Sequence, residues 1–182
     1  MSASLIKFKQ FEDIDAPWKI YPSEVLQLET KTPVNDYNKL NIDSRMKTQL
    51  TYERYDSYGN VLQQRGTDGQ TVSFLWDSSG LYKLAEVVGA TYDEVQNAAA
   101  GINLFVSAPN ANYLRSLRDL RAKLPQALIT NYSYKPLVGI TSQTGPNGMT
   151  IYYEYDKLNR LKRVRDHDGK VLKEYETVYD KQ

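Results

Sequence analysis

Four short segments recur along the chain in two pairs, and the two members of each pair are the same distance apart. Each segment begins with an aromatic residue: Tyr55 and Trp76 are 21 positions apart, and Tyr134 and Tyr155 are again 21 positions apart. Self-similarity at a fixed period is the signature of an array built from one supersecondary unit, in which each copy buries its apolar face against its neighbours. The repeat therefore constrains the architecture strongly and the activity very little.

A second mark begins 13 positions after the aromatic residue in three of the copies. It consists of Asp68-Gly69, Asn147-Gly148 and Asp168-Gly169. Asp-Gly and Asn-Gly between alternating runs are strong hairpin signals, because both residues of such a two-residue turn must accept positive φ. The intervening run Thr71–Trp76 places Val72, Phe74 and Trp76 on one face of a strand. The repeat therefore predicts a strand, a turn, a second strand and a second turn, with the aromatic face buried.

Tyrosine is the dominant aromatic residue, with 15 Tyr against 4 Phe and 2 Trp. A tyrosine buries a large ring but keeps a hydroxyl that needs a partner, and rows of rings on neighbouring strands form cross-strand pairs. This pattern favours a structural role. The alternative is a carbohydrate-binding platform of exposed rings. Its candidate binding residues are Tyr55, Trp76, Tyr134, Tyr153 and Tyr155.

Three elements of the repeat occur together in this chain. They are Tyr-Asp-x-x-Gly-Asn-Val-Leu from Tyr55, the Asp-Gly at 68–69, and strands that end in Trp76-Asp77 or in Tyr153-Glu154-Tyr155-Asp156. This ensemble resembles the YD repeat of Rhs-type bacterial proteins, in the form found in large surface or secreted proteins of Bacteroides-like bacteria. The resemblance covers residues 50–90 and 127–179. The third copy departs from it, because Lys135-Pro136 stands where the others have Asp.

The resemblance implies a non-enzymatic structural or interaction module, a fragment or terminal part of a YD-repeat array in a shell or surface protein. Its partners would be the rest of a larger repeat protein, or a second copy joined through the sheet edges Ser23–Lys31 and Lys170–Tyr179. It also implies an extracellular or cell-surface location. The first ten residues lack the apolar core of a signal peptide, so we expect the chain to be a piece of something larger. A glycan is the alternative partner.

The repeat is interrupted by a stretch with helical spacing. Thr91 and Glu94 form a capping-box pattern, which predicts one helix over 91–106 and a second over 110–124, ended by Pro125. The apolar stripes are Val95, Ala98, Ile102 and Phe105 in the first, and Leu114, Leu117, Leu120 and Leu124 in the second. We expect both stripes to cover one sheet face. Arg115, Arg118, Arg121 and Lys123 would form the solvated side of the second helix.

These signals divide the chain into four segments. Residues 1–45 are expected to be irregular with one strand, 46–90 to form the first YD-repeat pair, 91–125 the helical hairpin, and 126–182 the second repeat pair. Within the first segment, residues 1–23 should be irregular with Trp18 anchored on the sheet, and 32–43 should be a polar loop. The predicted fold class is α+β and mainly β: an antiparallel sheet of tandem YD-repeat hairpins, with about ten strands and an inserted helical hairpin packed on one face.

Two clusters could carry chemistry. His167 lies between Asp166 and Asp168, where it could act as a general base or join a calcium loop, but no nucleophile motif accompanies it and the calcium-loop pattern is incomplete. The other cluster is a basic run beside tyrosines, which could bind single-stranded nucleic acid. It consists of Arg160, Lys162, Arg163 and Arg165. Acidic residues in the same hairpin cancel its field. We therefore expect no catalytic residue, metal, cofactor or nucleic acid.

Composition excludes further classes of protein. The chain has no cysteine, which excludes disulfides and thiolate metal sites. Its 23 Lys and Arg are balanced by 22 Asp and Glu, so no general field attracts nucleic acid or anionic lipid. No apolar stretch approaches the length of about 18 residues that a membrane-spanning helix requires.

Overall fold

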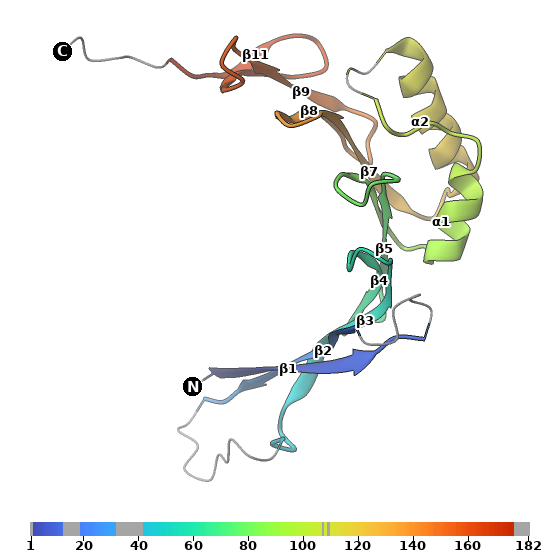
Figure 1. Ribbon diagram of the computed structural model, residues 1–182, viewed down its shortest axis with the longest axis vertical. Coiled ribbons are helices and arrows are strands. Elements are labelled where there is room, and N and C mark those ends of the chain that lie inside the picture. Colours follow the sequence, from blue (N-terminus) through green and yellow to red (C-terminus); the bar gives the residue numbers. More distant parts are fainter. Residues whose placement is uncertain (1, 13–18, 32–41, 107, 109, 177–182) are drawn as a thin grey trace, which may run out of the picture. The chain divides into compact units, whose positions relative to one another are not determined.

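The computed structural model describes residues 2–12, 19–31, 42–106, 108 and 110–176. They form a mainly β fold with two helices (Figure 1). The strands are β1 (Ser2–Gln10), β2 (Ile20–Glu29), β3 (Lys47–Tyr55), β4 (Val61–Gly66), β5 (Thr71–Trp76), β6 (Lys83–Val88), β7 (Leu128–Lys135), β8 (Gly139–Thr144), β9 (Thr150–Tyr155), β10 (Leu161–Arg165) and β11 (Val171–Glu174). These eleven strands form one antiparallel sheet in which spatial order equals sequence order.

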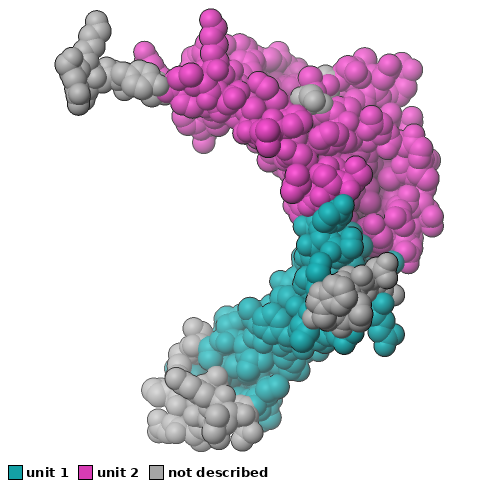
Figure 2. Space-filling model, viewed as in Figure 1, with its two compact units in different colours: residues 1–73 teal, residues 74–182 magenta. Residues whose placement is uncertain are grey.

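The chain divides into two compact units, residues 1–73 and 74–182 (Figure 2). The first unit contains β1 to β4 and the start of β5, and its small core is built from Phe11 and Tyr55. The second unit contains the rest of β5, the strands β6 to β11, both helices and the larger core. The segment 46–90 contains β3 to β6, which gives the two strands expected of each repeat copy.

Strand β1 corrects the expectation that residues 1–23 are irregular. It pairs with β2 from Ser2 opposite Glu29 to Gln10 opposite Ile20. The sequence hides this strand because apolar residues occur on both faces, and Ile6 and Phe8 stay 51% and 59% exposed. Because β1 pairs with β2, Ser23–Lys31 is not a sheet edge. The expectation that it would form one is wrong. Trp18 and most of the predicted 32–43 loop lie outside the described residues.

The three Asp-Gly and Asn-Gly pairs lie in tight hairpin turns, as predicted. In each turn the glycine N–H donates to the carbonyl three residues earlier, and the φ of Gly69, Gly148 and Gly169 is 77°, 78° and 82°. The turn type differs from the expectation. Each loop has three residues, a type I turn followed by one left-handed glycine. The Asp or Asn before the glycine keeps negative φ. In two of the turns its side-chain oxygen accepts a backbone N–H, and in the third Asp166, three residues before the glycine, does so. Asp68 Oδ1 accepts the N–H of Gln70, and Asn147 Oδ1 accepts that of Met149.

Gly169→Val should lower the free energy of unfolding by about 1 kcal/mol or more, because a β-branched residue is penalised at positive φ. No atom lies within 4 Å of the position that a Cβ would occupy at Gly169, so the cost is conformational and not steric. Gly169→Asn is the matched control. Asparagine tolerates left-handed backbone, and Asn159 already adopts φ 59° in a neighbouring turn. Equal losses for Val and Asn in urea unfolding would contradict this explanation.

The helices are α1 (Tyr92–Ala99) and α2 (Ala111–Lys123). The predicted capping box is present, since Thr91 Oγ1 accepts the N–H of Glu94 and the Glu94 carboxylate accepts the N–H of Thr91. Helix α1 is shorter than the predicted 91–106. It ends because Gly101, after the C-cap residue Ala100, takes a left-handed φ of 77°. Helix α2 matches its prediction, with Asn110 capping its first turn.

Both helices cover one face of the second unit's sheet (Figure 1). Val95, Leu117 and Leu120 are at most 1% exposed and pack with Val87 and Ile129 of the strands. Leu124 is also buried. The predicted partners Ile102, Phe105 and Leu114 are partly buried against the same cluster. The expected packing of both stripes on one face is therefore confirmed.

The buried face of this sheet is unusually polar. Ser73, Asn131 and Ser133 are each 0% exposed. Hydroxyls pair across neighbouring strands, with Ser133 Oγ 2.6 Å from Ser142 Oγ and Thr144 Oγ1 2.9 Å from Thr150 Oγ1. These pairs satisfy polar groups that would be costly to bury alone.

The predicted aromatic face is therefore not the face under the helices. In β5 the buried residues are Ser73 and Leu75, whereas Val72, Phe74 and Trp76 alternate to the other side and are half-buried. The helix-covered face thus combines small hydroxyl side chains with Leu75, while on the other side Lys83 Nζ lies 5.3 Å from the Phe74 ring centroid.

Leu117→Ala should lower the free energy of unfolding by about 2–5 kcal/mol, the range for a large side chain removed from a core. Leu117 is 1% exposed between α2 and the sheet. Leu158→Ala makes the same chemical change at a side chain that is 67% exposed, so it should change stability by at most about 0.5 kcal/mol. Chemical denaturation compares the two. A similar small loss for both would show that α2 does not form the core described here.

Candidate functional site

Three tyrosines that begin repeat copies make the same hydrogen bond. Tyr55, Tyr134 and Tyr155 stand at or next to the ends of β3, β7 and β9. Their hydroxyls donate to the backbone carbonyls of Pro22, Lys83 and Ile140, at 2.8, 2.8 and 2.9 Å. Each acceptor lies at the start of the strand that precedes and pairs with the tyrosine's own strand. The repeat tyrosine thus ties each of these strands to the one before it.

The rings around these tyrosines are packed with other rings. Tyr55 is 5% exposed and stacks on Tyr21, with ring centroids 4.7 Å apart, while Phe11 meets it edge-on at 4.9 Å. Burial raises the pKa of Tyr55 well above its ordinary value. Tyr134 lies 5.0 Å from the ring of Tyr82, and burial raises its pKa to about 12. These phenols are therefore held neutral, as hydrogen-bond donors.

The residue after the repeat tyrosine organises the turn that follows. Asp56 Oδ1 accepts the N–H groups of Tyr58 and Asn60, and Asp156 Oδ1 accepts those of Leu158 and Arg160. Hydrogen bonds from the backbone and side chain of Arg160 hold the pKa of Asp156 below its usual range. A short carboxylate at this position therefore replaces missing backbone partners within the turn.

The third repeat copy, which begins at Tyr134, forms the turn after the tyrosine although it lacks the aspartate at the next position. Leu137 takes the left-handed conformation at φ 61°, is 97% exposed, and donates its N–H to the Tyr82 hydroxyl at 3.1 Å. Gly139 is required by close approach, because a Cβ there would lie 2.5 Å from the hydroxyl oxygen of Tyr155. The departure at Lys135-Pro136 thus changes how the turn is held but not the hairpin.

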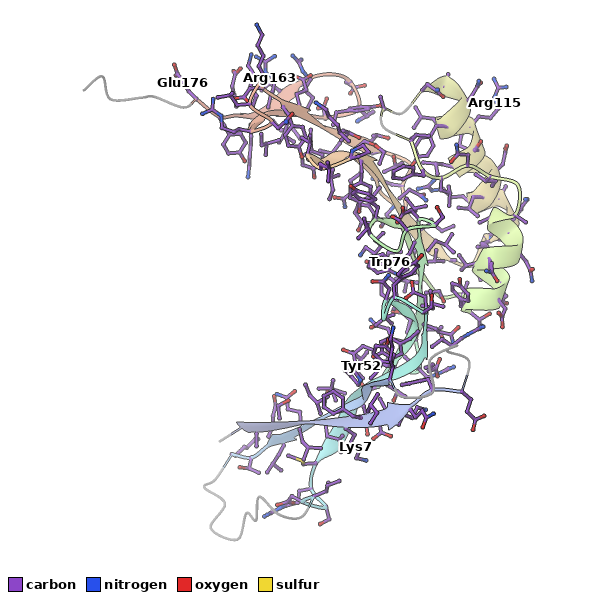
Figure 3. All side chains as sticks on the ribbon, viewed as in Figure 1. Lys7, Tyr52, Trp76, Arg115, Arg163 and Glu176 are labelled. Carbon is purple, nitrogen blue, oxygen red and sulfur yellow. The ribbon has the colours of Figure 1, made fainter. Side chains whose placement is uncertain are left out.

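The five candidate binding aromatics do not form one exposed platform. Tyr55 belongs to the first unit and is buried. The other four are half-buried residues of three different strands of the second unit: Trp76, Tyr134, Tyr153 and Tyr155. Lys83 places a cation against two other rings of the second unit. Its Nζ lies 5.3 Å from the Phe74 ring centroid and 5.1 Å from that of Tyr132. Figure 3 labels Trp76 on β5, and its side chain projects to the side opposite the helices.

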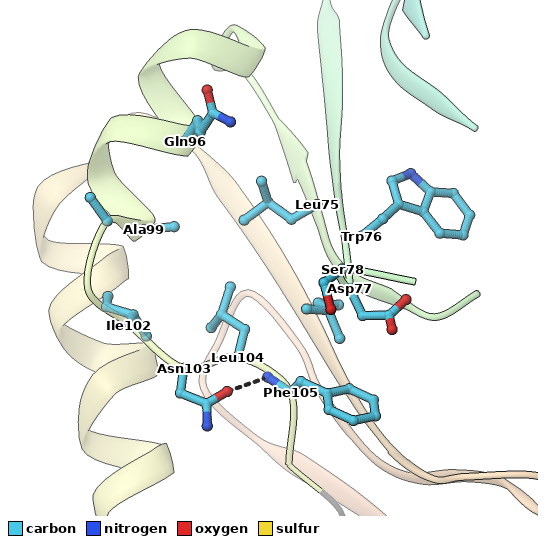
Figure 4. A pocket seen from close by; sticks show the side chains of 12 residues that line it. Leu75, Trp76, Asp77, Ser78, Gln96, Ala99, Ile102, Asn103, Leu104 and Phe105 are labelled. Carbon is cyan, nitrogen blue, oxygen red and sulfur yellow. Dashed lines mark hydrogen bonds between the residues drawn. The ribbon is translucent and has the colours of Figure 1, made fainter. Parts of the chain in front are cut away.

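A cavity of about 470 Å³ lies beside the end of α1, next to Trp76 (Figure 4). Leu75 and Leu104 point toward its interior, and Trp76 points away from it. Its polar groups are mostly committed. Asn103 Oδ1 accepts the N–H of Phe105, and Asp77 accepts the N–H groups of Ser79, Leu81 and Tyr82. The cavity is thus an apolar notch with a polar rim.

His167 and its flanking aspartates form a turn, as expected from their place in the repeat. Asp166 Oδ1 accepts the N–H groups of Asp168 and Lys170, at 3.0 and 2.8 Å. His167 Nε2 lies 3.4 Å from Asp168 Oδ2, and one ligand atom from each of the three residues falls within 4.8 Å of the others. Because two of the three residues are exposed and the third organises the turn, this geometry is explained by the hairpin alone.

Three of the four residues of the basic run are paired with acids. Arg163 contacts Glu174, Arg165 Nε donates to Glu154 Oε1 at 2.7 Å, and Arg160 bonds to Asp156. The predicted cancellation of its positive field by nearby carboxylates is therefore seen in the geometry.

Arg121 corrects the expectation that the arginines of α2 lie on its solvated side. Its Nη1 donates to Leu117 O, and its Nη2 donates to Ile129 O and Gly145 O at 3.0 Å each. Loss of solvation lowers the pKa of its guanidinium. A spacing signal was present, because Arg121 lies four residues after Leu117 and three before Leu124 and therefore falls in the apolar stripe.

Three buried polar groups under α2 have unsatisfied atoms. Among the described residues, Tyr113 Oη, Arg121 Nε and both side-chain polar atoms of Asn131 have no hydrogen-bond partner. Burial raises the pKa of Tyr113 to about 12. Sequence reasoning missed Tyr113 and Asn131 because neither belongs to a recognisable motif.

Comparison with known proteins adds no assignment. No model of a protein family matches the chain, and no curated protein matches it. In the part of the chain that the structure describes, no helix is long and apolar enough to cross a membrane.

Tyr155→Phe should lower the free energy of unfolding by about 0.5–1.5 kcal/mol, the net value of one hydrogen bond, and by more if the carbonyl of Ile140 is left unsatisfied. The control is Tyr153→Phe, two residues earlier on the same strand face, because no hydroxyl bond is found for Tyr153 among the described residues. Equal stability of the two variants in thermal and chemical unfolding would show that the hydroxyl bond contributes nothing.

Proposed function

We propose that this chain is a non-enzymatic structural module, a part of a YD-repeat array that joins further strands at its sheet edges. One observation carries the proposal: the repeat tyrosine bonds to the preceding strand at three places, in a sheet whose spatial order follows the sequence. Such a unit adds strands one after another and depends on a neighbour on each side. Its partners are the rest of a larger repeat protein or a second copy of the chain.

The edge strand β11 supports this role. All four residues from Val171 to Glu174 are exposed, and Val171 and Leu172 are 40% and 50% exposed. The Tyr175 N–H donates to Lys162 O on β10. Because successive amides of a strand point to opposite sides, the amide of Glu174 points to the open side. An open edge of this kind is a template for pairing with another strand.

Glu174→Pro should reduce self-association, because it removes an outward amide and gives the open edge a residue that cannot donate. Glu174→Ala is the matched control: it removes the same carboxylate, and the same ion pair with Arg163, but keeps the amide. Light scattering across a concentration series is the measurement. We expect the mean mass to rise with concentration for the wild type and for Glu174→Ala, and to rise less for Glu174→Pro. A wild-type chain that stays strictly monomeric would contradict the proposal.

A carbohydrate-binding module is the second candidate. It is favoured by the cavity beside α1, where Trp76, Phe105 and the amides of Gln96 and Asn103 meet, because aromatic and amide groups suit sugars. Against it, Trp76 points away from that cavity, and the other candidate rings are buried or only half-exposed. Binding of soluble oligosaccharides by a monomeric wild type, lost on Trp76→Ala but kept on Phe74→Ala, would favour this candidate over the structural one.

A further inference from the structure

A second cavity of about 380 Å³ lies in the second unit, between α2 and the strands β8 and β9. Helix α2 supplies one wall, the β8–β9 hairpin supplies another, and the β10–β11 turn contributes His167. This volume is at the lower end of the range for small-molecule sites, roughly 300–1,000 Å³. The residues that line it are Ala111, Leu114, Leu117, Arg118, Arg121, Thr144, Gly148, Thr150, Tyr152 and His167.

The charge of this lining has one sign. Its charged residues are two arginines, its other polar groups are His167 and the hydroxyls of Thr144, Thr150 and Tyr152, and it has no Asp or Glu. Acids border the cavity without lining it: Asp119 follows Arg118 on α2 and is exposed, and Asp168 Oδ2 lies 3.4 Å from His167 Nε2. Asp166 accepts two backbone N–H groups of its own turn, and Glu154 pairs with arginines of β10. The lining itself therefore carries the positive charge of two arginines and no carboxylate.

Both arginines have N–H donors without a protein acceptor among the described residues: Arg118 is exposed, and Arg121 Nε is a buried atom. Within the described residues, Arg118 makes no hydrogen bond or ion pair, and Arg121 binds only carbonyl oxygens and leaves Nε–H without an acceptor. Carbonyl groups orient a guanidinium but do not neutralise its charge. Because guanidinium groups match the two oxygens of a carboxylate or phosphate, an anion would complete what the protein leaves unpaired.

The rest of the lining is apolar. Ala111, Leu114 and Leu117 come from the same face of α2 as the arginines, so a ligand would meet charged donors and an aliphatic wall together. A bare inorganic anion would use only the first of these.

We propose that this cavity binds an organic anion, a carboxylate or phosphate carried on a small apolar or aromatic group. Arg118 and Arg121 bind the charged oxygens, and the leucines of α2 contact the apolar part. This site is independent of the sheet edges and of the proposed structural role.

Isothermal titration of the full chain with phenyl phosphate, benzoate, inorganic phosphate and benzyl alcohol tests the proposal. We expect phenyl phosphate or benzoate to bind, inorganic phosphate to bind more weakly, and benzyl alcohol not to bind. A preference between the first two distinguishes phosphate from carboxylate ligands. Amide chemical-shift changes confined to the cavity residues, Gly148 and Thr150 included, should accompany binding.

Arg118→Gln should weaken binding about tenfold or more, the loss expected for a charge-assisted hydrogen bond. Because Arg118 is exposed, the fold should survive, which circular dichroism checks. Arg115→Gln is the matched control, since it makes the same charge change one turn earlier on α2. Arg115 is exposed and projects away from the sheet (Figure 3), so its loss should leave affinity within about twofold.

Three results would overturn the proposal. The first is no binding of either aromatic anion at millimolar concentration. The second is equal loss of affinity in Arg118→Gln and Arg115→Gln, which would indicate attraction by the overall charge of the helix. The third is equal binding of benzyl alcohol, which would show that the cavity selects for an apolar group and not for charge.

Discussion

Short turns join consecutive strands from β3 to β6 and from β7 to β11, and that constraint governs the rest of the fold. The β6–β7 connection differs, because it contains both helices. A three-residue loop leaves no room for a crossover, so a chain of such loops forms an antiparallel meander. The turn needs one residue at positive φ, which Gly69, Gly148 and Gly169 supply. In the other turn of the repeat, just after the aromatic residue, Gly59 and Gly80 have positive φ, and Asn159 or Leu137 takes the left-handed conformation in the copies without such a glycine. Backbone N–H groups in those two turns donate to side chains.

An antiparallel meander alone leaves both of its faces in contact with water. The two faces of the second unit's sheet are shielded from water in different ways. The inserted helices cover one face, where small hydroxyl residues pair across strands and Leu117, Leu120 and Val95 supply the apolar contact. On the other face, Lys83 Nζ lies over the rings of Phe74 and Tyr132, and the hydroxyls of Tyr134 and Tyr155 bind backbone carbonyls near the strand ends. Tyrosine suits this position because its ring excludes water while its hydroxyl satisfies a carbonyl.

Sequence reasoning could predict the parts of the fold that have a local cause. The turns, the strands β3 to β6, the capping box at Thr91 and the extent of α2 all follow from short patterns. It failed where the cause is tertiary. Ser73, Ser133 and Asn131 carry no hydrophobic signal, yet their face of the sheet is the one the helices bury, whereas the sequence indicated the aromatic face as the buried one. Strand β1 was missed because its partner β2, not its own pattern, holds it in place.

The candidate sites also divide into features with a local cause, which the sequence predicts, and features with a tertiary cause, which it does not. The turn role of Asp166 and the ion pairs of β10 could be predicted from neighbouring residues. The orientation of Arg121 could not, because charge suggested solvent while spacing placed it in the apolar stripe of α2. Its guanidinium is tolerated there because two backbone carbonyls accept its hydrogen bonds. They belong to Ile129, at the start of β7, and to Gly145, just after the end of β8. Those carbonyls are dipoles and not charges. The arginine therefore retains a positive charge in a partly desolvated place, a cost that an anion in the adjoining cavity would offset.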